Sequence, residues 1–407
     1  MDYAATTPVD PDVADKIKKF FDYKIDNFGN PSSIHYFGQR AKSALDFSRE
    51  KIAKAITANH REIIFTSSAT EANNLILRGI LKAYYKKYGG CKTMPKFIIS
   101  SVEHPSILET AAALEKDGSV EVAYLPVDSH GIVDLAALKK ELNERTILVS
   151  VMWVSNETGS IQPISEIVNL VQNFRRSKLQ MANNKKNEKS EDYNLTAAYP
   201  LIHTDAVQAF NLFDLNVIKS GVDLMTLSSH KIYGPKGAGA AYIKGGADRA
   251  DFIEPIITGG DQEYGLRSGT ENVPAIAGFS KAAEISSSTY KSEFKRLQGL
   301  SERFFENLKK EMPEVEINGS MDRRSPNIIN IYFPRHENLG ITLDIVGVAA
   351  SAGSACAQRY EKPSYVLSAM GYPQERVKQS IRFSFGRFST EEEIDDASER
   401  IIKALKK

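Results

Sequence analysis

The sequence predicts an α/β fold in which a mostly parallel sheet is covered by helices on both faces. Short β-rich runs alternate with helical stretches from about residue 62 to about residue 230, which is the pattern of consecutive βα units. With 407 residues, the chain is long enough for two domains, or for one large domain with a smaller one attached. A different, α+β order of elements follows beyond about residue 260, and we expect it to form the second domain.

Hydrophobic periodicity predicts the elements of the first region. Apolar side chains at Ala41, Ala44, Leu45, Ile52 and Ala55 recur at spacings of three, four and seven, so we expect an amphipathic helix from about residue 36 to 57. The predicted strands are short and rich in β-branched residues. They cover residues 62–66, 97–100, 120–124, 147–151, 201–204 and 222–227.

The second region mixes helices and strands. A long helical region is followed by a predicted strand at 327–333, a helix from Leu339 to Val346, a strand at 380–385 and a terminal helix that begins at Thr390. Residues 177–199 are polar, of mixed charge and without an apolar period. We therefore expect a mobile surface insertion there.

Composition excludes several classes of protein. Lys plus Arg number 52 and Asp plus Glu 51, so a net charge of +1 provides no long-range attraction to nucleic acid or to an anionic membrane. Cys91 and Cys356 are the two cysteines, too few for a disulfide framework or a four-cysteine metal site, and we predict no metal centre. No segment approaches about 18 uninterrupted apolar residues. We expect a cytoplasmic protein with small neutral or zwitterionic substrates.

Lys231 is the most informative position for function. It follows the predicted strand 222–227, and open α/β sheets bind ligands at such strand ends. Ser228 and His230 precede it and a Gly-Pro turn follows. A lysine in this setting can hold a phosphorylated aldehyde, pyridoxal phosphate, as a Schiff base. Taken alone, a lysine before a Gly-Pro turn is more often a solvated loop charge.

Polar side chains follow four other predicted strands. The segment 66–74 opens a helix whose N-terminus attracts phosphate, although ordinary N-capping by Ser68 or Thr70 fits the same motif. Asp205 can keep a pyridine nitrogen protonated, and Gln208 lies one turn away. The remaining two are His104, which can stack on a planar ring and move protons near neutral pH, and Asn156. Each also fits a cap or another structural role.

Three further motifs point to binding or catalysis. The segment 259–272, which is rich in glycine and contains Thr270, can close over a phosphate of a neighbouring subunit, or can be a domain linker. Cys356 lies among small residues that suggest a mobile loop, where a thiolate is a nucleophile; a small buried residue is the alternative. Arg382, inside a predicted strand, needs a carboxylate, either structural or on the substrate. Cys91 shares no motif with these groups.

These motifs together resemble the cysteine desulfurases of the NifS and IscS type, in the class-V aminotransferase family of fold type I pyridoxal phosphate enzymes. The resemblance runs from Asp2-Tyr3-Ala4-Ala5-Thr6-Thr7-Pro8 through Phe28-Gly29-Asn30-Pro31-Ser32-Ser33 to Ser384-Phe385-Gly386-Arg387-Phe388, over nearly the whole chain. It implies a large cofactor-binding domain at residues 14–258. A smaller α+β domain at 1–13 and 259–407 would carry the cysteine loop.

The resemblance also implies a role for each site residue. Lys231 binds the cofactor covalently, Asp205 pairs with the pyridine nitrogen, and His104 stacks on the ring. Gln208 and Asn156 lie near the ring hydroxyl. The phosphate-binding positions correspond to Ala69, Thr70, Ser228 and His230, with Thr270 reaching across a homodimer.

The implied reaction converts L-cysteine to L-alanine. Arg382 holds the substrate carboxylate, Lys231 moves the α proton, and Cys356 takes the sulfur as a persulfide. A sulfur-acceptor or scaffold protein then receives it for iron-sulfur clusters or another sulfur-containing product.

Some features depart from the family pattern. Ser229 and Asp261 stand where glycine is commoner, and neither change removes a side chain that the chemistry needs. The chain begins almost on the Asp2-Tyr3 motif, which suggests a missing N-terminal stretch, and it ends without the tail that some relatives use to dock a scaffold. The insertion resembles one in selenocysteine lyases. A selenocysteine lyase therefore stays open as an alternative, as does a non-catalytic binding protein of the same fold.

Overall fold

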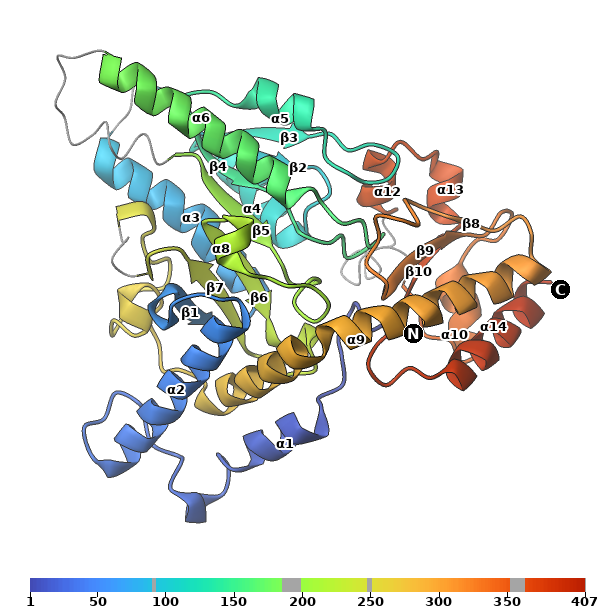
Figure 1. The fold of residues 1–407 in the computed structure, drawn as a ribbon, viewed down its shortest axis with the longest axis horizontal. Coiled ribbons are helices and arrows are strands. Elements are labelled where there is room, and N and C mark those ends of the chain that lie inside the picture. Colours follow the sequence, from blue (N-terminus) through green and yellow to red (C-terminus); the bar gives the residue numbers. More distant parts are fainter. Residues whose placement is uncertain (90–92, 185–198, 247–250, 352–362, 407) are drawn as a thin grey trace.

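A computed structural model of the protein describes residues 1–89, 93–184, 199–246, 251–351 and 363–406. Within these residues, seven strands form one sheet in the order β1-β7-β6-β5-β4-β2-β3 (Figure 1). β7 runs antiparallel to both of its neighbours, and the other pairings in this sheet are parallel. The strands are β1 (Ile63–Thr66), β2 (Lys96–Ser100), β3 (Glu121–Leu125), β4 (Thr146–Ser150), β5 (Leu201–Asp205), β6 (Leu224–Ser228) and β7 (Gly239–Ile243).

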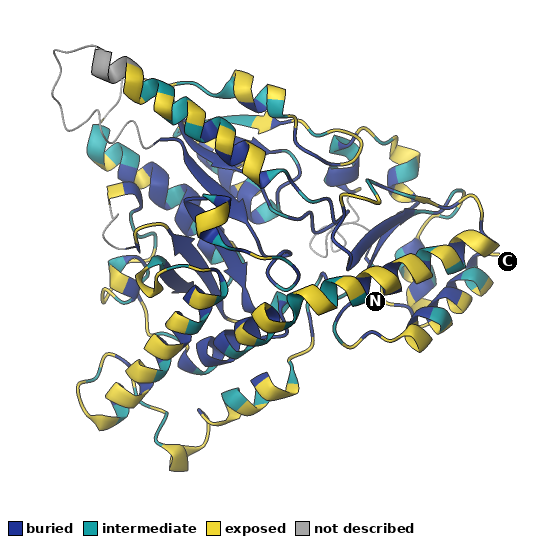
Figure 2. Cartoon of the chain, in the orientation of Figure 1, coloured by how far each residue is buried: buried dark blue, intermediate teal, exposed yellow. Residues whose placement is uncertain are grey.

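Helices cover both faces of this sheet because successive residues of a strand point to opposite sides. In β1, Ile64 packs into a core with α3 (Ala69–Tyr88) and α4 (Pro105–Lys116). Its neighbours Ile63 and Phe65 pack into the core on the other face, with α2 (Tyr36–Ala55), α5 (Leu135–Glu141) and α6 (Ile164–Asn184). Figure 2 shows the sheet as a buried layer between these helices. The predicted α/β architecture is confirmed.

A further hydrophobic core, separate from the two on the faces of the large sheet, lies beside a small antiparallel sheet. The described part of this sheet has the order β10-β9-β8, with β8 (Glu316–Ile317), β9 (Ile328–Tyr332) and β10 (Ser380–Ser384). The helix α9 (Val273–Glu311) joins this core to the large sheet: Phe279 packs into the core that contains α2, α5 and α6, and Phe304 packs beside the small sheet with α14 (Glu391–Leu405) (Figure 1). The predicted domain boundary near residue 258 stays a prediction, to which the structure adds that one helix serves both of these cores.

The N-terminus of α14 is capped, and the remaining described helices are shorter than α14. α14 begins with a capping box, since Thr390 accepts from the N–H of Glu393 and Glu393 accepts from that of Thr390. The other helices are α1 (Pro11–Lys18), α8 (Val217–Ser220), α10 (Leu339–Ile345), α12 (Tyr365–Ala369) and α13 (Gln374–Lys378), with 3₁₀ turns at Tyr23–Ile25, His60–Glu62, Ser229–Lys231 and Glu263–Gly265.

The structure differs from the sequence-based expectations at β7, at the two-residue strand β8 and at the start of the insertion. β7 was not predicted, because its glycine and alanines carry little strand propensity; its position between β1 and β6 decides its conformation. The predicted insertion is helical at its start, since α6 continues to Asn184. Lys178, Leu179 and Gln180 are good helix formers, so the lack of an apolar period did not exclude a helix. Residues 185–198 lie outside the described residues.

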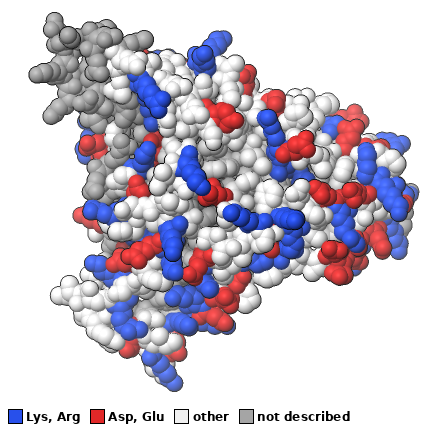
Figure 3. Space-filling view, in the orientation of Figure 1, with Lys and Arg blue, Asp and Glu red and all other residues white. Residues whose placement is uncertain are grey.

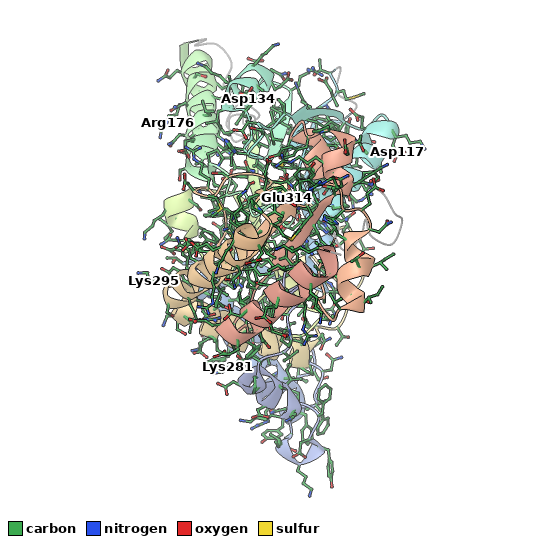
Figure 4. All side chains as sticks on the ribbon, turned by 90° about the vertical axis from the view of Figure 1, so that its right-hand side faces the viewer. Asp117, Asp134, Arg176, Lys281, Lys295 and Glu314 are labelled. Carbon is green, nitrogen blue, oxygen red and sulfur yellow. The ribbon has the colours of Figure 1, made fainter. Side chains whose placement is uncertain are left out.

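Charges of both signs are interspersed on the face seen in Figure 3. Figure 4 shows labelled charged side chains, including Asp117, Arg176 and Lys295, at the periphery of the molecule. No helix in the described ranges is both long enough and apolar enough to cross a bilayer.

Candidate active site

One cavity collects most of the predicted site residues. The strands β1, β2, β4, β5 and β6 run in the same direction, so their carboxyl ends meet at one edge of the sheet. A cavity of about 250 Å³ opens at this edge. The predicted residues that line it are Ala69, Thr70, His104, Asn156, Asp205, Gln208, Ser228, His230, Lys231 and Arg382.

One end of the cavity is built to bind an anion. Ser68 caps α3 by accepting from the N–H of Glu71 at 3.2 Å, and the N–H groups of Ala69 and Thr70 precede the first helical hydrogen bonds. Ser228 Oγ is buried and has no hydrogen-bond partner among the described residues. The backbone approaches closely here: a Cβ on Gly239 would lie 2.7 Å from the backbone carbon of Ser68.

His230 completes this end of the cavity. Its Nδ1 lies 3.1 Å from Thr6 Oγ1. Burial, and then repulsion from the ammonium groups of Lys231 and Lys236, lowers the pKa of His230 to about 4. The ring is therefore neutral at neutral pH and can donate one hydrogen bond to a ligand without adding a charge.

Asp205 offers a buried carboxylate to the same cavity. It is the last residue of β5. Its Oδ1 accepts from the N–H of Val207 at 3.1 Å, and its Oδ2 accepts from Asn73 Nδ2 at 3.0 Å. Such a carboxylate suits a cationic ring nitrogen.

His104 caps α4 and borders the same cavity. Its Nδ1 accepts from the N–H of Ser106 at 3.1 Å and lies 2.8 Å from Ser106 Oγ. Burial lowers the pKa of His104, the Asp205 carboxylate opposes this shift, and Lys231 adds to it. The result is a neutral ring, which suits stacking on a planar ligand.

Lys231 is held by backbone groups of the N-terminal segment. Its Nζ donates to the carbonyl oxygen of Ala4 at 2.5 Å and to that of Ala5 at 2.8 Å. Gln208 Nε2 donates to the same Ala4 oxygen at 3.0 Å. The amine therefore lies on the cavity wall, between the sheet edge and the first residues of the chain.

Arg382 pairs with a carboxylate of its own chain. Its Nη2 donates to Asp2 Oδ1 at 2.7 Å and its Nη1 to the carbonyl oxygen of Asn156 at 2.7 Å. Only 1% of Arg382 is exposed, and its Nε has no partner among the described residues. The guanidinium is thus fixed in place and keeps donor capacity toward the cavity.

Two predicted site residues are not among those that line the cavity. Thr270 is exposed. Cys356 falls in residues 352–362, outside the described residues. The chain enters that segment beside the site, because Ser351 and Arg382 exchange backbone hydrogen bonds of 3.1 and 2.8 Å.

The sequence reasoning missed Asp2, Asn73, Ser106 and Glu103 as parts of the site. Asp2 and Asn73 stand inside motifs that the sequence analysis names, while Glu103 precedes His104 and Ser106 follows it by two residues. The contact of Ser106 with His104 is local, but the contacts of Asp2, Asn73 and Glu103 join elements that are distant in the chain. No spacing in the sequence could have shown these distant contacts.

Glu103 is a buried carboxyl group next to the cavity. The N–H of Met152 donates to its Oε1, while its Oε2 has no partner among the described residues. Burial, and then repulsion from Asp205, raises the pKa of Glu103 well above its usual range. Burial and the nearby Asp205 carboxylate therefore favour the protonated form of Glu103 in the folded protein.

We expect Glu103→Gln to change the pH dependence of stability. The unfolded chain loses this proton near pH 4 and the folded protein keeps it, so folding becomes weaker as the pH rises toward the folded pKa. Glutamine cannot ionise and removes this loss, which is about 1.4 kcal/mol for each unit by which the pKa is raised. Urea unfolding between about pH 5 and pH 8 measures the free energy of unfolding of the parent and of Glu103→Gln. The control is Glu109→Gln, at an exposed position of α4. Parallel profiles for Glu103→Gln and the parent would contradict the inference.

Comparison with known proteins agrees with this geometry. The class-V aminotransferase family model matches residues 1–179 and 195–396, leaving out part of the predicted insertion. The cysteine desulfurase IscS of Dictyoglomus turgidum is 42% identical over 412 residues, covering 100% of this chain and 95% of the relative. The chain belongs to the NifS/IscS-type cysteine desulfurases of the class-V aminotransferase family.

Other desulfurases and solved structures extend this agreement. The cysteine desulfurase IscS 1 of Archaeoglobus fulgidus is 39% identical, covering 99% of this chain and 95% of the relative. A solved NifS-like protein has a TM-score of 0.83 and 34% identity, covering 100% of this chain and 98% of its own. SspA in complex with cysteine has a TM-score of 0.76 and 30% identity, covering 96% and 99%. The resemblance and the fold type I architecture are confirmed.

Desulfurases of this family depend on pyridoxal phosphate, and the cavity fits that group. The buried, unpartnered Ser228 Oγ lies with the start of α3, where a phosphate can bind. Asp205 offers its carboxylate to a ring nitrogen, and Lys231 supplies a primary amine. The residues present therefore match the three distinctive parts of the cofactor.

Proposed function

We propose that this chain removes sulfur from L-cysteine with the residues that line the cavity. In the balanced reaction, L-cysteine and the Cys356 thiol give L-alanine and a Cys356 persulfide. The observation that carries the proposal is that Lys231, Asp205, His104 and Arg382 border one cavity in a chain of the desulfurase family. The comparisons do not favour a selenocysteine lyase or a non-catalytic protein.

Bound pyridoxal phosphate would withdraw electrons from the substrate α carbon. Ala69, Thr70, Ser228 and His230 would hold its phosphate, and Asp205 its ring nitrogen. Asn156 and Gln208 would border the ring. Because His230 and His104 are neutral, Asp205 faces no competing imidazolium ion inside the cavity.

Arg382 would bind the cysteine carboxylate. The guanidinium is oriented by Asp2 and by the Asn156 carbonyl before the substrate arrives, so little side-chain entropy is lost on binding. This fixes the amino acid with its α carbon near Lys231. Charge pairing with the carboxylate would favour amino acids over neutral thiols.

Lys231 Nζ would move the α proton. In the structure this atom donates to the carbonyl oxygens of Ala4 and Ala5. These oxygens hold the amine beside the cavity while it is not covalently bound, so it need not leave the site. A held amine can take up and return a proton over a short distance.

We further propose a homodimer in which Thr270 contributes to the partner's site. Thr270 is exposed on a segment that is rigidly attached, since Glu263 forms a buried bidentate pair of 2.6 Å with Arg49. Large apolar side chains are exposed elsewhere on the chain, among them Tyr23 (76%) and Ile34 (94%). Contact with a second copy would cover such surface.

The acceptor and the location of the protein complete the proposal. The persulfide on Cys356 must be passed to another thiol, so a sulfur-acceptor or scaffold protein is expected to bind near the 352–362 segment. We propose that the sulfur is used for iron-sulfur cluster assembly, in line with the IscS relatives. Two cysteines without a disulfide framework support a cytoplasmic location.

Cys356→Ala tests the proposed sulfur transfer. We expect sulfide release from cysteine to fall by about 100-fold, because no thiol remains to attack the substrate sulfur. Cofactor binding should be unchanged. The assay measures alanine, sulfide and the mass of the persulfide peptide, with Cys91→Ala as the control. Unchanged sulfide release in Cys356→Ala would refute the assigned role. Turnover of selenocysteine with a negligible rate on cysteine would favour a selenocysteine lyase instead.

A further inference from the structure

A chain of hydrogen bonds behind the cavity joins His104 to Asp205. Asn73, on α3, is fully buried. Its Nδ2 donates to Ser106 Oγ at 2.8 Å and to Asp205 Oδ2 at 3.0 Å. Ser106 Oγ in turn lies 2.8 Å from His104 Nδ1. The path therefore links three elements: α3, the start of α4 and the end of β5.

The direction of each hydrogen bond follows from the groups that can only donate or only accept. The backbone N–H of Ser106 can only donate, so His104 Nδ1 must accept and carries no proton. The Ser106 hydroxyl must then also donate to Nδ1. Its oxygen is left to accept from the Asn73 amide, whose second N–H reaches the Asp205 carboxylate.

The amide orientation of Asn73 is set by the same reasoning. The opposite orientation would place Asn73 Oδ1 against a carboxylate oxygen of Asp205, and two acceptors would then face each other. In the observed orientation, Oδ1 is buried without a partner among the described residues. Leaving a buried amide oxygen without a hydrogen bond costs free energy. The orientation that carries this cost is the one that directs both amide N–H groups at Ser106 and Asp205.

We propose that Asn73 and Ser106 are positioning residues that fix His104 as its neutral Nε2–H tautomer and hold Asp205 as an acceptor. The inference rests on the proposed function for its catalytic meaning. It deepens that function, since the group that stacks on the ring and the group that binds its nitrogen are set together by one path. His104 then presents a proton on Nε2 to the cavity, and protonation of Nδ1 would break two hydrogen bonds.

The charged groups that act on His104 are Asp205, from β5, and Lys231, from the turn after β6. The buried carboxyl group of Glu103, whose pKa is raised, precedes His104 in the chain. Ser106→Ala changes none of these charges. It removes only one of the two donors to Nδ1, so any change in the His104 titration reports the hydroxyl itself.

The test uses the full-length holoenzyme with ¹⁵N-labelled histidine, and His104→Gln assigns the two ring signals by their loss. We expect the parent to show a protonated Nε2 and an unprotonated Nδ1 throughout the neutral range. In Ser106→Ala the proton affinity of His104 should rise by about 10-fold, because protonation then breaks one hydrogen bond fewer. We expect kcat to fall by about 5- to 30-fold with little change in KM.

Asn73→Ala tests the path rather than a single contact. The structure gives Asn73 no hydrogen bond to His104, yet its removal should shift the His104 Nδ1 signal through Ser106. The effects of Asn73→Ala and Ser106→Ala on that signal should be less than additive in the double variant, because both interrupt one path.

Thr110→Val is the matched control. It removes a buried hydroxyl of α4 that also bonds to α3, from Thr110 Oγ1 to Asn74 Oδ1 at 3.1 Å, but outside the path. Its His104 signals and kcat should equal those of the parent. If Ser106→Ala and Asn73→Ala also behave like the parent, the proposal is overturned. The ring signals need no cysteine, so a failure of the desulfurase function would be seen separately from a failure of this path.

Discussion

Replacing Lys231 by alanine is expected to lower cysteine turnover by about 10⁴-fold or more, because the variant loses the amine that we propose binds the cofactor and moves the α proton. The structure places Lys231 Nζ on the cavity wall, held by the carbonyl oxygens of Ala4 and Ala5. No other lysine is among the residues that line this cavity in the described ranges. The loss therefore has no substitute.

The measurement has two parts. Alanine and sulfide production report turnover, and borohydride reduction followed by peptide mapping reports whether the cofactor is covalently bound at residue 231. Lys236→Ala is the control, since Lys236 is exposed in the same loop and does not line the cavity. Covalent labelling of another lysine in the parent enzyme would show that Lys231 has been assigned the wrong role.

Arg382→Gln is expected to lower kcat/KM for cysteine by about 10³-fold, mainly through KM. A buried guanidinium that binds a carboxylate by charge-assisted hydrogen bonds is costly to remove. The loss appears in KM because the carboxylate is bound equally in the ground state and the transition state. Glutamine also leaves Asp2 without its guanidinium partner, while Ser351 Oγ, at 3.0 Å, still donates to it. Arg382→Lys should rescue little, since an ammonium cannot reproduce the two-pronged contact.

Steady-state kinetics of alanine formation at varied cysteine concentration measure this effect. Arg376→Gln serves as the control, because Arg376 does not line the cavity. Its Cζ lies 4.7 Å from the ring centroid of Tyr332 and 4.5 Å from that of Tyr372. Its KM should stay within about twofold of the parent. A KM for Arg382→Gln that matches the parent would mean that the substrate carboxylate binds elsewhere.

The positions of the site residues were largely predictable from the sequence. His104, Asp205 and Lys231 each follow a short β-rich run, and parallel strands bring such positions to one edge. The same local patterns predicted the bounds of α2 and of most strands, β7 excepted, to within about two residues. The reason is physical: burial on both faces requires continuous apolar runs, and these are visible along the chain.

The contacts of these residues were not predictable. Arg382 was expected to need a carboxylate, and Asp2 supplies it from the other end of the chain. Lys231 is held by backbone carbonyl oxygens, which have no signature in a pattern of side chains. β7 was missed because its small residues adopt a strand only between two others.

The sequence by itself thus determined the fold class, the family and the edge of the sheet where the chemistry is expected, because these depend on local periodicity and on motifs of neighbouring residues. Only the tertiary structure decided the protonation and pairing of the groups at that edge. Burial at Glu103, the Asp2–Arg382 pair and the path from Asn73 to His104 arise where distant segments meet. The free energy of a proton or a charge depends on that three-dimensional environment, whatever the order of residues along the chain.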